Sequence, residues 1–294
     1  MRTVECGIKA YDIHELLCHF VAVRRGFYAA EGLDVRLVDT SFIPDDRLPD
    51  ANFFQVACGA AFLSRGVSFR IFLAAVTKPM FWLYGVAGIN TVEQLAGKRI
   101  ATYPSQAPPY WFNRIALRNH GLDPDTDVEL KPARDDAIRL GLLREGAVDA
   151  ALISSAVSPV TVTRTGLNML TLLGDEVAFV TSGIATTEKI AQKDPALMEG
   201  LVGAYQRSLA VIHHSPADIC PILAEITGVS EEVAEETYRL VLPCYTPDGY
   251  VGMKTLQAML DTMKTEPGTD APVNAGELYD LRLTLNSNEI RAGL

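Results

Sequence analysis

The chain has 294 residues, of which 48% are hydrophobic and 21% are charged, and its formal net charge is -10. The longest apolar runs are too short to span a bilayer, and no cluster of lysines and arginines offers the basic face that nucleic acids require. We therefore expect a soluble globular protein of one large or two ordinary domains, with no membrane segment and no nucleic-acid partner.

Strand-like and helix-like segments alternate through the first 80 residues. Leu16, Phe20 and Val21 recur at helical spacing, which predicts a helix over 13–25. The run 69–75 is continuously apolar, as the strands of a covered parallel sheet are. The expected strands are 4–9, 34–39, 53–57 and 69–75, and the expected helices are 13–25 and 59–65.

A polar break at 77–79 precedes a second series of alternating strands and helices. Pro195 and Pro216 stand at the first position of two later helices, where proline is favoured. The expected strands of the second series are 99–102, 128–130, 150–153 and 169–173, and its helices are 108–120, 135–145 and 157–164. After a return near 180–183, the expected helices are 195–214, 216–227, 231–240 and 253–263.

This alternation predicts an α/β fold with mostly parallel sheets. A chain that leaves one lobe, builds another and returns makes two lobes joined by two crossings. We expect residues 1–80 with 183–294 in the first lobe and residues 81–182 in the second. Such lobes close on a ligand in the cleft between them, and parallel strands direct their carboxyl ends toward it.

Two helix-to-strand junctions carry a family resemblance. Residues 25–37 read RGFYAAEGLDVRL and residues 91–102 read TVEQLAGKRIAT, with glycine stops at Gly32 and Gly97. Together with DDAIRLGLLREGAVDAALIS and the segment that begins GIATTEKIAQKDPALMEGL, they resemble the solute-binding proteins of bacterial ABC importers. Within that group, the chain is similar to the branch that binds nitrate, sulfonates, taurine and thiamine-pyrimidine precursors.

The resemblance implies a type 2 periplasmic-binding-protein fold and a small organic ligand, anionic or polar aromatic, in the interlobe cleft. It also implies an ABC permease as partner if the protein is exported. We expect a monomer or homodimer, no cofactor and no metal site. The adjacent cysteines and the ring-donating histidine of the related pyrimidine-precursor synthases are missing, so that chemistry is not expected.

In the first lobe, the candidate ligand contacts follow two of the expected strands. Tyr11, Asp12 and His14 come directly after the first strand and open a helix. Asp12 has the alternative role of a helix N-cap, and His14 that of a surface side chain. Cys58 follows the third strand, where a thiol either touches the ligand or fills the core.

In the second lobe, the candidates are polar and aromatic residues near strand ends. Ser105 and Gln106 precede a helix start, where backbone N–H groups favour an anion or a carbonyl oxygen; the alternative is a loop that only caps its own helix. Three adjacent aromatic residues begin that helix and cannot all face one side. The further candidates are Lys78 at the crossing, Tyr110 and Trp111 on the helix, and Ser154 after a buried strand.

An enzyme on the same scaffold is the alternative function. It would perform decarboxylase, lyase or dehydratase chemistry on a small acid, with His14 moving a proton, Asp12 orienting it and Cys58 as nucleophile or polar wall. The five scattered cysteines and the lack of a secretory signal favour the cytoplasm for the chain as written, or the periplasm if a signal was removed. The role of the loop 243–252 is left open; it would cover the cleft rim.

Overall fold

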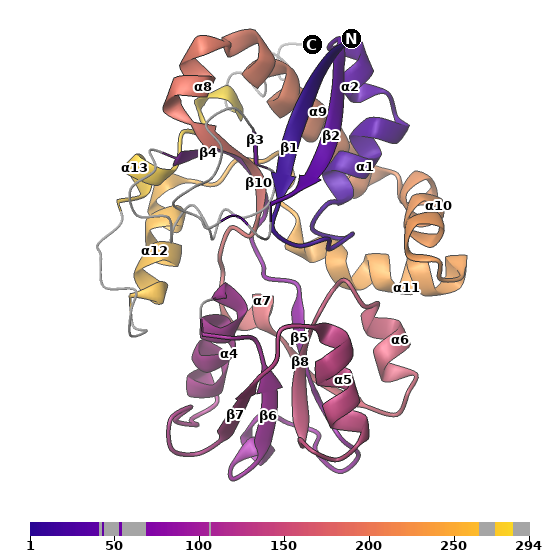
Figure 1. Ribbon diagram of the computed structural model, residues 1–294, viewed down its shortest axis with the longest axis vertical. Helices are drawn as coiled ribbons and strands as arrows, with labels where there is room; N and C mark the ends of the chain where they lie inside the picture. Colours follow the sequence, from indigo (N-terminus) through magenta and orange to yellow (C-terminus); the bar gives the residue numbers. More distant parts are fainter. Residues whose placement is uncertain (41–42, 44–52, 55–68, 106, 265–273, 285–294) are drawn as a thin grey trace. The chain divides into compact units, whose positions relative to one another are not determined.

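The computed structural model describes residues 1–40, 43, 53–54, 69–105, 107–264 and 274–284 (Figure 1). The chain divides into two compact units. Unit 1 comprises Met1–Thr77 and Phe179–Leu294, and unit 2 comprises Lys78–Ala178. Each unit contains its own five-stranded sheet.

The sheet of unit 1 has the strand order β2-β1-β3-β10-β4. Strand β1 pairs in parallel with β2 and β3, whereas β10 is antiparallel to β3 and β4. Strand β10 therefore runs opposite to the other four strands. The carboxyl ends of β1 and β4 lie at the same edge of the sheet. The bounds are β1 Arg2–Ile8, β2 Leu33–Asp39, β3 Phe53–Phe54, β4 Phe69–Val76 and β10 Ser182–Thr187.

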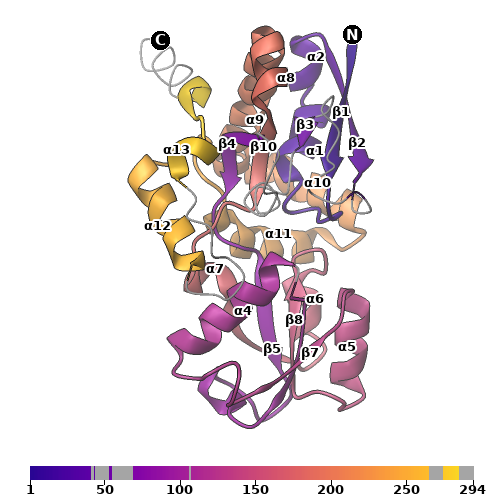
Figure 2. The same ribbon diagram turned by 60° about the vertical axis from the view of Figure 1, so that its left-hand side comes forward.

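Helices cover this sheet, and the longest of them shows why they form where they do. Helix α9 starts at Pro195, and the Asp194 carboxylate caps it by accepting from the Leu197 N–H at 3.0 Å. Helix α13 lies beside β4, and α12 packs against α13 (Figure 2). The helices of unit 1 are α1 Leu17–Arg24, α2 Phe27–Ala30, α8 Glu188–Lys193, α9 Pro195–His214, α10 Pro216–Thr227, α11 Glu231–Val241, α12 Met253–Met263 and α13 Ala275–Leu278, with a short 3-10 turn η3 at Leu242–Cys244.

The sheet of unit 2 has the order β7-β6-β8-β5-β9, with β5 antiparallel to both of its neighbours. The strands are β5 Phe81–Gly85, β6 Arg99–Thr102, β7 Glu129–Pro132, β8 Ala150–Ser154 and β9 Asn168–Leu172. The helices are η2 Glu93–Leu95, α4 Pro108–Asn119, α5 Asp136–Arg144, α6 Pro159–Thr163 and α7 Leu173–Glu176.

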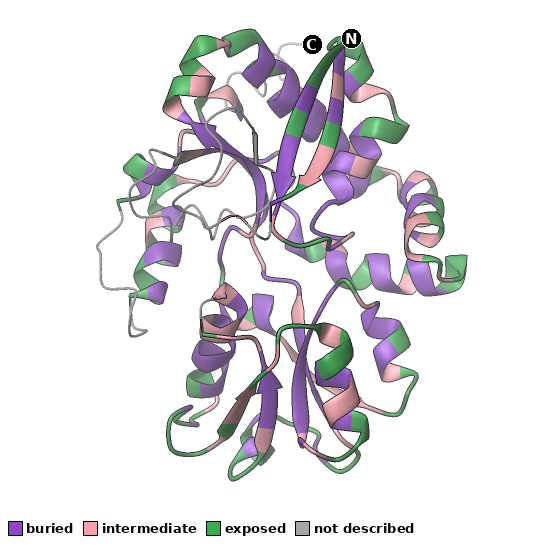
Figure 3. Cartoon of the chain, viewed as in Figure 1, coloured by how far each residue is buried: buried purple, intermediate pink, exposed green. Residues whose placement is uncertain are grey.

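The core of each unit follows its strands. All five residues of β8 are buried, and Leu83, Ile100 and Leu117 belong to one apolar cluster on a face of the unit 2 sheet. Buried residues follow the strands and the inner faces of the helices, while exposed residues gather on outer helix faces such as that of α5 (Figure 3). Packing of this kind is what the apolar runs in the sequence require.

The elements differ from those expected at several places. Strand β10 and the short helices α7, α8 and α13 were not predicted. The expected helix 59–65 and residues 55–57 of an expected strand lie outside the described residues. Strand β5 was not predicted either, because no element was assigned between the polar break at 77–79 and the expected strand 99–102. The first helix begins at Leu17 rather than at residue 13, because the side chain of Asp12 accepts the backbone N–H groups of His14 and Glu15 and holds a turn there.

Candidate functional site

The turn after β1 buries three titratable side chains within four positions. Asp12, His14 and Glu15 have exposed fractions of 6%, 2% and 6%. Asp12 Oδ1 accepts from the backbone N–H of His14 at 3.0 Å and of Glu15 at 3.4 Å, which fixes the turn. Asp12 therefore holds the turn before α1 and is not the N-cap of that helix, which is Leu16. His14 is buried rather than on the surface.

Glu15 is the member of this cluster that the sequence analysis missed. Thr181 donates its hydroxyl to Glu15 Oε1 at 2.8 Å, and the Ser182 hydroxyl donates to the Glu15 carbonyl at 2.7 Å. Burial raises the pKa of Glu15 to about 8, and the nearby Asp12 carboxylate adds to the effect. Glu15 is thus a neutral acid near pH 7. Its sequence position, at a helix start, is typical of an ordinary exposed acid and carries no signal of burial.

The Asp12 and His14 side chains lie near each other, and a distant loop holds the backbone at His14. His14 Nδ1 is 3.9 Å from Asp12 Oδ1. The Tyr245 hydroxyl donates to the carbonyl oxygen of His14. Burial raises the pKa of Tyr245 well above its ordinary value, so this phenol remains a donor. Tyr11, in contrast, is 60% exposed, with its ring at the edge of Phe20.

The loop that contains Tyr245 runs along the edge strand of unit 1. The Thr77 N–H donates to the Cys244 carbonyl at 3.0 Å, and the Thr246 N–H donates to the Ala75 carbonyl at 2.9 Å. The Thr246 hydroxyl donates to the Ala74 carbonyl at 2.7 Å. The loop whose role the sequence left open therefore covers the edge of β4, which satisfies its backbone groups.

In unit 2, Ser154 at the end of β8 belongs to a buried polar network. Its hydroxyl donates to Asp136 Oδ2 at 2.6 Å, and its N–H donates to Oδ1 at 3.0 Å. The Arg139 guanidinium is fully buried, pairs with the same carboxylate and donates to the Leu152 carbonyl at 2.6 Å. The Ser154 hydroxyl therefore donates its hydrogen bond within unit 2. This contact holds the end of β8 against α5.

The same arginine lies over the first aromatic ring after β6. The Arg139 guanidinium carbon is 3.7 Å from the ring centre of Tyr103, and the Phe81 ring meets Tyr103 nearly at right angles with ring centres 5.5 Å apart. Such a stack of cation and ring is favourable in a desolvated place. Tyr103 is half-buried, so this end of the sheet carries a firmly held aromatic surface.

The loop before α4 is less suited to an anion than expected. Ser105 is exposed, as a ligand contact requires. The helix, however, starts with Pro108 and Pro109, which have no N–H, and the N–H of Tyr110 donates to the Ala107 carbonyl at 3.0 Å. The first backbone donors of the helix are therefore missing or already used.

The remaining unit 2 candidates have partners within the unit. Lys78 Nζ is 2.8 Å from Asp175 Oδ1, so its charge is paired. Tyr110 and Trp111 are half-buried, stand edge to face with ring centres 5.0 Å apart, and flank the guanidinium of Arg114. The Arg114 guanidinium is buried and pairs with Asp125 through two hydrogen bonds of 2.7 Å, so the two rings pack on a neutralised charge. The third aromatic residue of the run is buried.

Cys58 and Gln106 lie outside the described residues. Within the described part of the chain, no group of three or more His, Cys, Asp or Glu side chains is arranged to hold a metal ion. The helices described in the structure include none with the length and apolar character needed to cross a membrane.

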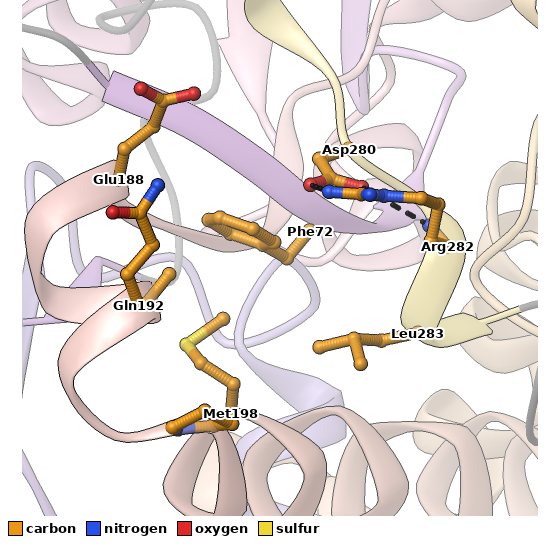
Figure 4. A pocket seen from close by; sticks show the side chains of 9 residues that line it. Phe72, Glu188, Gln192, Met198, Asp280, Arg282 and Leu283 are labelled. Atoms are coloured by element: carbon orange, nitrogen blue, oxygen red, sulfur yellow. Dashed lines mark hydrogen bonds and ion pairs between the residues drawn. The ribbon is translucent and has the colours of Figure 1, made fainter.

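A pocket of about 350 Å³ lies elsewhere in unit 1, where α8 and the start of α9 meet β4 (Figure 4). Phe72 and Met198 contribute to its apolar wall. Its charged rim is internally paired, since Arg282 Nε donates to Asp280 Oδ1 at 2.7 Å. None of the residues predicted from the sequence lines it.

A match to a protein-family model shows the family of this chain. The model of the family described as NMT1/THI5 like matches residues 65–219. The chain belongs to the NMT1/THI5-like family. This membership confirms the resemblance seen in the sequence. A comparison with curated protein sequences gives no match.

Several solved structures share the fold of this protein across nearly the whole chain. The periplasmic aliphatic sulphonate-binding protein SsuA of Escherichia coli has a TM-score of 0.76 at 16% identity, over 97% of this chain and 99% of that one. The periplasmic nitrate-binding protein NrtA of Synechocystis PCC 6803 has 0.75 at 13%, over 99% and 89%. The desulfurization enzyme DSZB has 0.72 at 15%, over 99% and 100%. These likenesses confirm the predicted type 2 periplasmic-binding-protein fold.

Proposed function

We propose that this protein is a solute-binding protein that reversibly binds a small organic anion. The observation that carries the proposal is the burial of Asp12, His14 and Glu15 at the carboxyl end of β1. Burying three titratable groups costs stability, and such groups gather where a protein binds or transforms a ligand. In α/β folds, the carboxyl ends of the strands are where ligands bind.

The anionic class is supported by the proteins that share the fold. SsuA is named for aliphatic sulphonates and NrtA for nitrate, and both are described as periplasmic. We propose the same ligand class here, with Asp12, His14 and Cys58 as contacts in unit 1 and Ser105, Gln106 and the Tyr103 ring in unit 2. An ABC permease is the proposed partner if the protein is exported.

A thermal-shift screen tests the proposal with sulfonates, carboxylates, aromatic acids and pyrimidines. A ligand that binds only the folded state raises the melting temperature in proportion to the logarithm of its excess over Kd. We expect at least one anionic class to do so. If none of the four classes shifts the melting temperature, the solute-binding proposal is wrong.

Ser105→Ala tests the unit 2 contact. Because Ser105 is exposed, the variant should keep the wild-type melting temperature without ligand and lose part of the ligand-induced shift. Thr255→Ala removes a hydroxyl from an exposed position of α12 and is the matched control. Equal shifts in the wild type and both variants would remove Ser105 from the site.

An enzyme is the second candidate, favoured by the buried Asp12 and His14 pair and by the fold likeness to the desulfurization enzyme DSZB. In this alternative, His14 transfers a proton, Asp12 orients it and Cys58 is the nucleophile or a polar wall. Mass spectrometry of small sulfinic and carboxylic acids incubated with the protein distinguishes turnover from binding. If His14→Gln and Cys58→Ala both keep full turnover of a converted acid, this assignment is wrong.

A further inference from the structure

We propose that Glu15 sets the charge at the ligand-binding end of unit 1, and that the site accepts an anion only while this side chain carries its proton. The inference rests on the proposed function, because it concerns which ligand charge that site tolerates. It adds a residue that the sequence analysis did not include and gives it a definite chemical role.

The placement of Glu15 supports the proposal through its contacts. Its side chain is buried one position beyond His14, in the turn that Asp12 holds. Its Oε1 accepts from the Thr181 hydroxyl, so in the neutral acid the proton is carried by the other oxygen. Thr181 stands where the chain re-enters unit 1, just before β10, so the carboxyl joins two segments of the site.

The Asp12 carboxylate makes it unfavourable for the neighbouring Glu15 to lose its proton and become negatively charged. Among the described residues, Asp12 raises its pKa, and Glu15 and Asp12 act together on Tyr245 of the edge loop. His14 lies between the two acids in sequence, and Cys18 of α1 and Cys244 of the loop also contribute to the raised pKa of Tyr245. Two further charged residues stand at the same strand ends: Lys9 follows β1, and Asp39 ends β2 opposite Ile8.

The charge of the bound ligand follows from this arrangement. With Glu15 neutral, the turn after β1 carries the carboxylate of Asp12, which accepts hydrogen bonds from two backbone N–H groups. Loss of the Glu15 proton adds a second negative charge to this buried turn. Because little water screens a buried charge, it would repel an anionic ligand strongly. Because the pKa of Glu15 is raised to about 8, the change falls just above neutral pH.

The experiment measures binding of methanesulfonate, taurine and nitrate by isothermal titration calorimetry at about pH 6 and about pH 9. If binding requires the protonated acid, affinity falls up to about tenfold for each pH unit above the pKa. We expect this loss for the wild type. Glu15→Gln keeps an oxygen acceptor for Thr181 and has no proton to lose, so its affinity should be the same at both pH values. Glu5→Gln, at an exposed position of β1, is the matched control and should behave as the wild type.

A second variant makes a directional test. The hydrogen bond from Thr181 lowers the pKa of Glu15, so Thr181→Val should move the loss of affinity to higher pH. Equal affinities at both pH values in the wild type, or the same loss in Glu15→Gln, would overturn the role of Glu15 and leave solute binding intact. If none of the three anions binds at either pH, but another class of molecule raises the melting temperature, the anionic ligand and this proposal both fail.

Discussion

The phenolic hydroxyl of Tyr245 donates a hydrogen bond to the carbonyl oxygen of His14, which lies 231 positions earlier in the chain. This contact joins the loop that covers the edge of β4 to the turn after β1. Both groups are buried, so neither has water as a ready substitute partner. The polar cluster at the carboxyl end of β1 is therefore held from two sides, by Asp12 from within the turn and by Tyr245 from the loop.

Tyr245→Phe should destabilise unit 1 by about 1–2 kcal/mol, because the carbonyl of His14 would stay buried without this donor. Urea denaturation of the wild type and the variant measures the difference. Tyr11→Phe removes the same atom from an exposed side chain and should leave the midpoint unchanged. Equal midpoints for all three proteins would mean that the hydroxyl of Tyr245 contributes nothing to stability.

Ser154→Ala should lower stability even without ligand. The half-buried Asp136 carboxylate would lose the hydroxyl donor at 2.6 Å, at a cost of about 1–3 kcal/mol. Arg139→Met should cost more, about 3–5 kcal/mol, because the carboxylate would lose its positive partner. Calorimetric melting of both variants gives the comparison. A Ser154→Ala protein with wild-type stability and weakened ligand binding would instead identify this hydroxyl as a ligand contact.

The sequence was sufficient for the fold class because its signals are periodic and local. The run 69–75 and the proline-started helix at Pro195 each appear in the structure close to their predicted bounds. Strand β5 was missed because a five-residue apolar run beside a polar crossing has no distinctive period. It becomes a strand through pairing with β8 and β9, which are distant in the sequence.

The candidate site was harder to predict because burial and pairing depend on distant segments. Asp12 and His14 were chosen from their place after a strand, and the structure brings them to the same buried turn. Glu15 gave no sign in sequence, because its burial depends on β10 and on the loop of Tyr245. Ser154 was correctly placed at a strand end, but its partner Asp136 was not foreseen.

A histidine between two glutamates should make the stability of unit 2 depend on pH. His120 Nδ1 is 2.6 Å from Glu93 and its Nε2 is 2.8 Å from Glu176. The pKa of His120 is raised, chiefly by its hydrogen bonds with Glu93 and Glu176. Hydrogen bonding from His120 lowers the pKa of Glu93 to about 2. The pKa of Glu176 is lowered as well, because its hydrogen bonds with His120, Thr171 and Asn119 outweigh the opposing effect of burial.

The signs of these shifts define the pH window. The contribution of His120 is fully present below its unfolded pKa of about 6.5 and is lost as pH rises through its folded pKa. The contributions of the glutamates are present above about pH 4.5 and are lost as pH falls. The difference in melting temperature between the wild type and His120→Asn should therefore be largest near pH 5 to 6. A difference that stays constant from pH 4 to pH 9 would contradict this arrangement.

The edge loop depends on one glycine whose place is tightly enclosed. Gly249 has φ +85°, and a Cβ built there would lie 2.5 Å from Cγ of Leu73 in β4. The Gly249 carbonyl also accepts from the Ala74 N–H at 3.0 Å, so the loop cannot move away without losing a bond to the strand. Side chains rarely adopt this φ, and the Leu73 side chain is fully buried, so it has little space into which to move.

Gly249→Ala should therefore destabilise the protein by about 2–3 kcal/mol, through backbone strain and overpacking together. Gly252→Ala is the control from the same loop, because Gly252 has φ -63° and open space around the position of the added Cβ. It should change stability by less than about 1 kcal/mol, because alanine restricts the unfolded chain but is less favourable than glycine at the N-cap of α12. Because Tyr245 reaches His14 from this loop, Gly249→Ala should also weaken ligand binding, whereas Gly252→Ala should not. If the two variants have equal melting temperatures and equal affinities, the loop does not hold the site in the way the structure indicates.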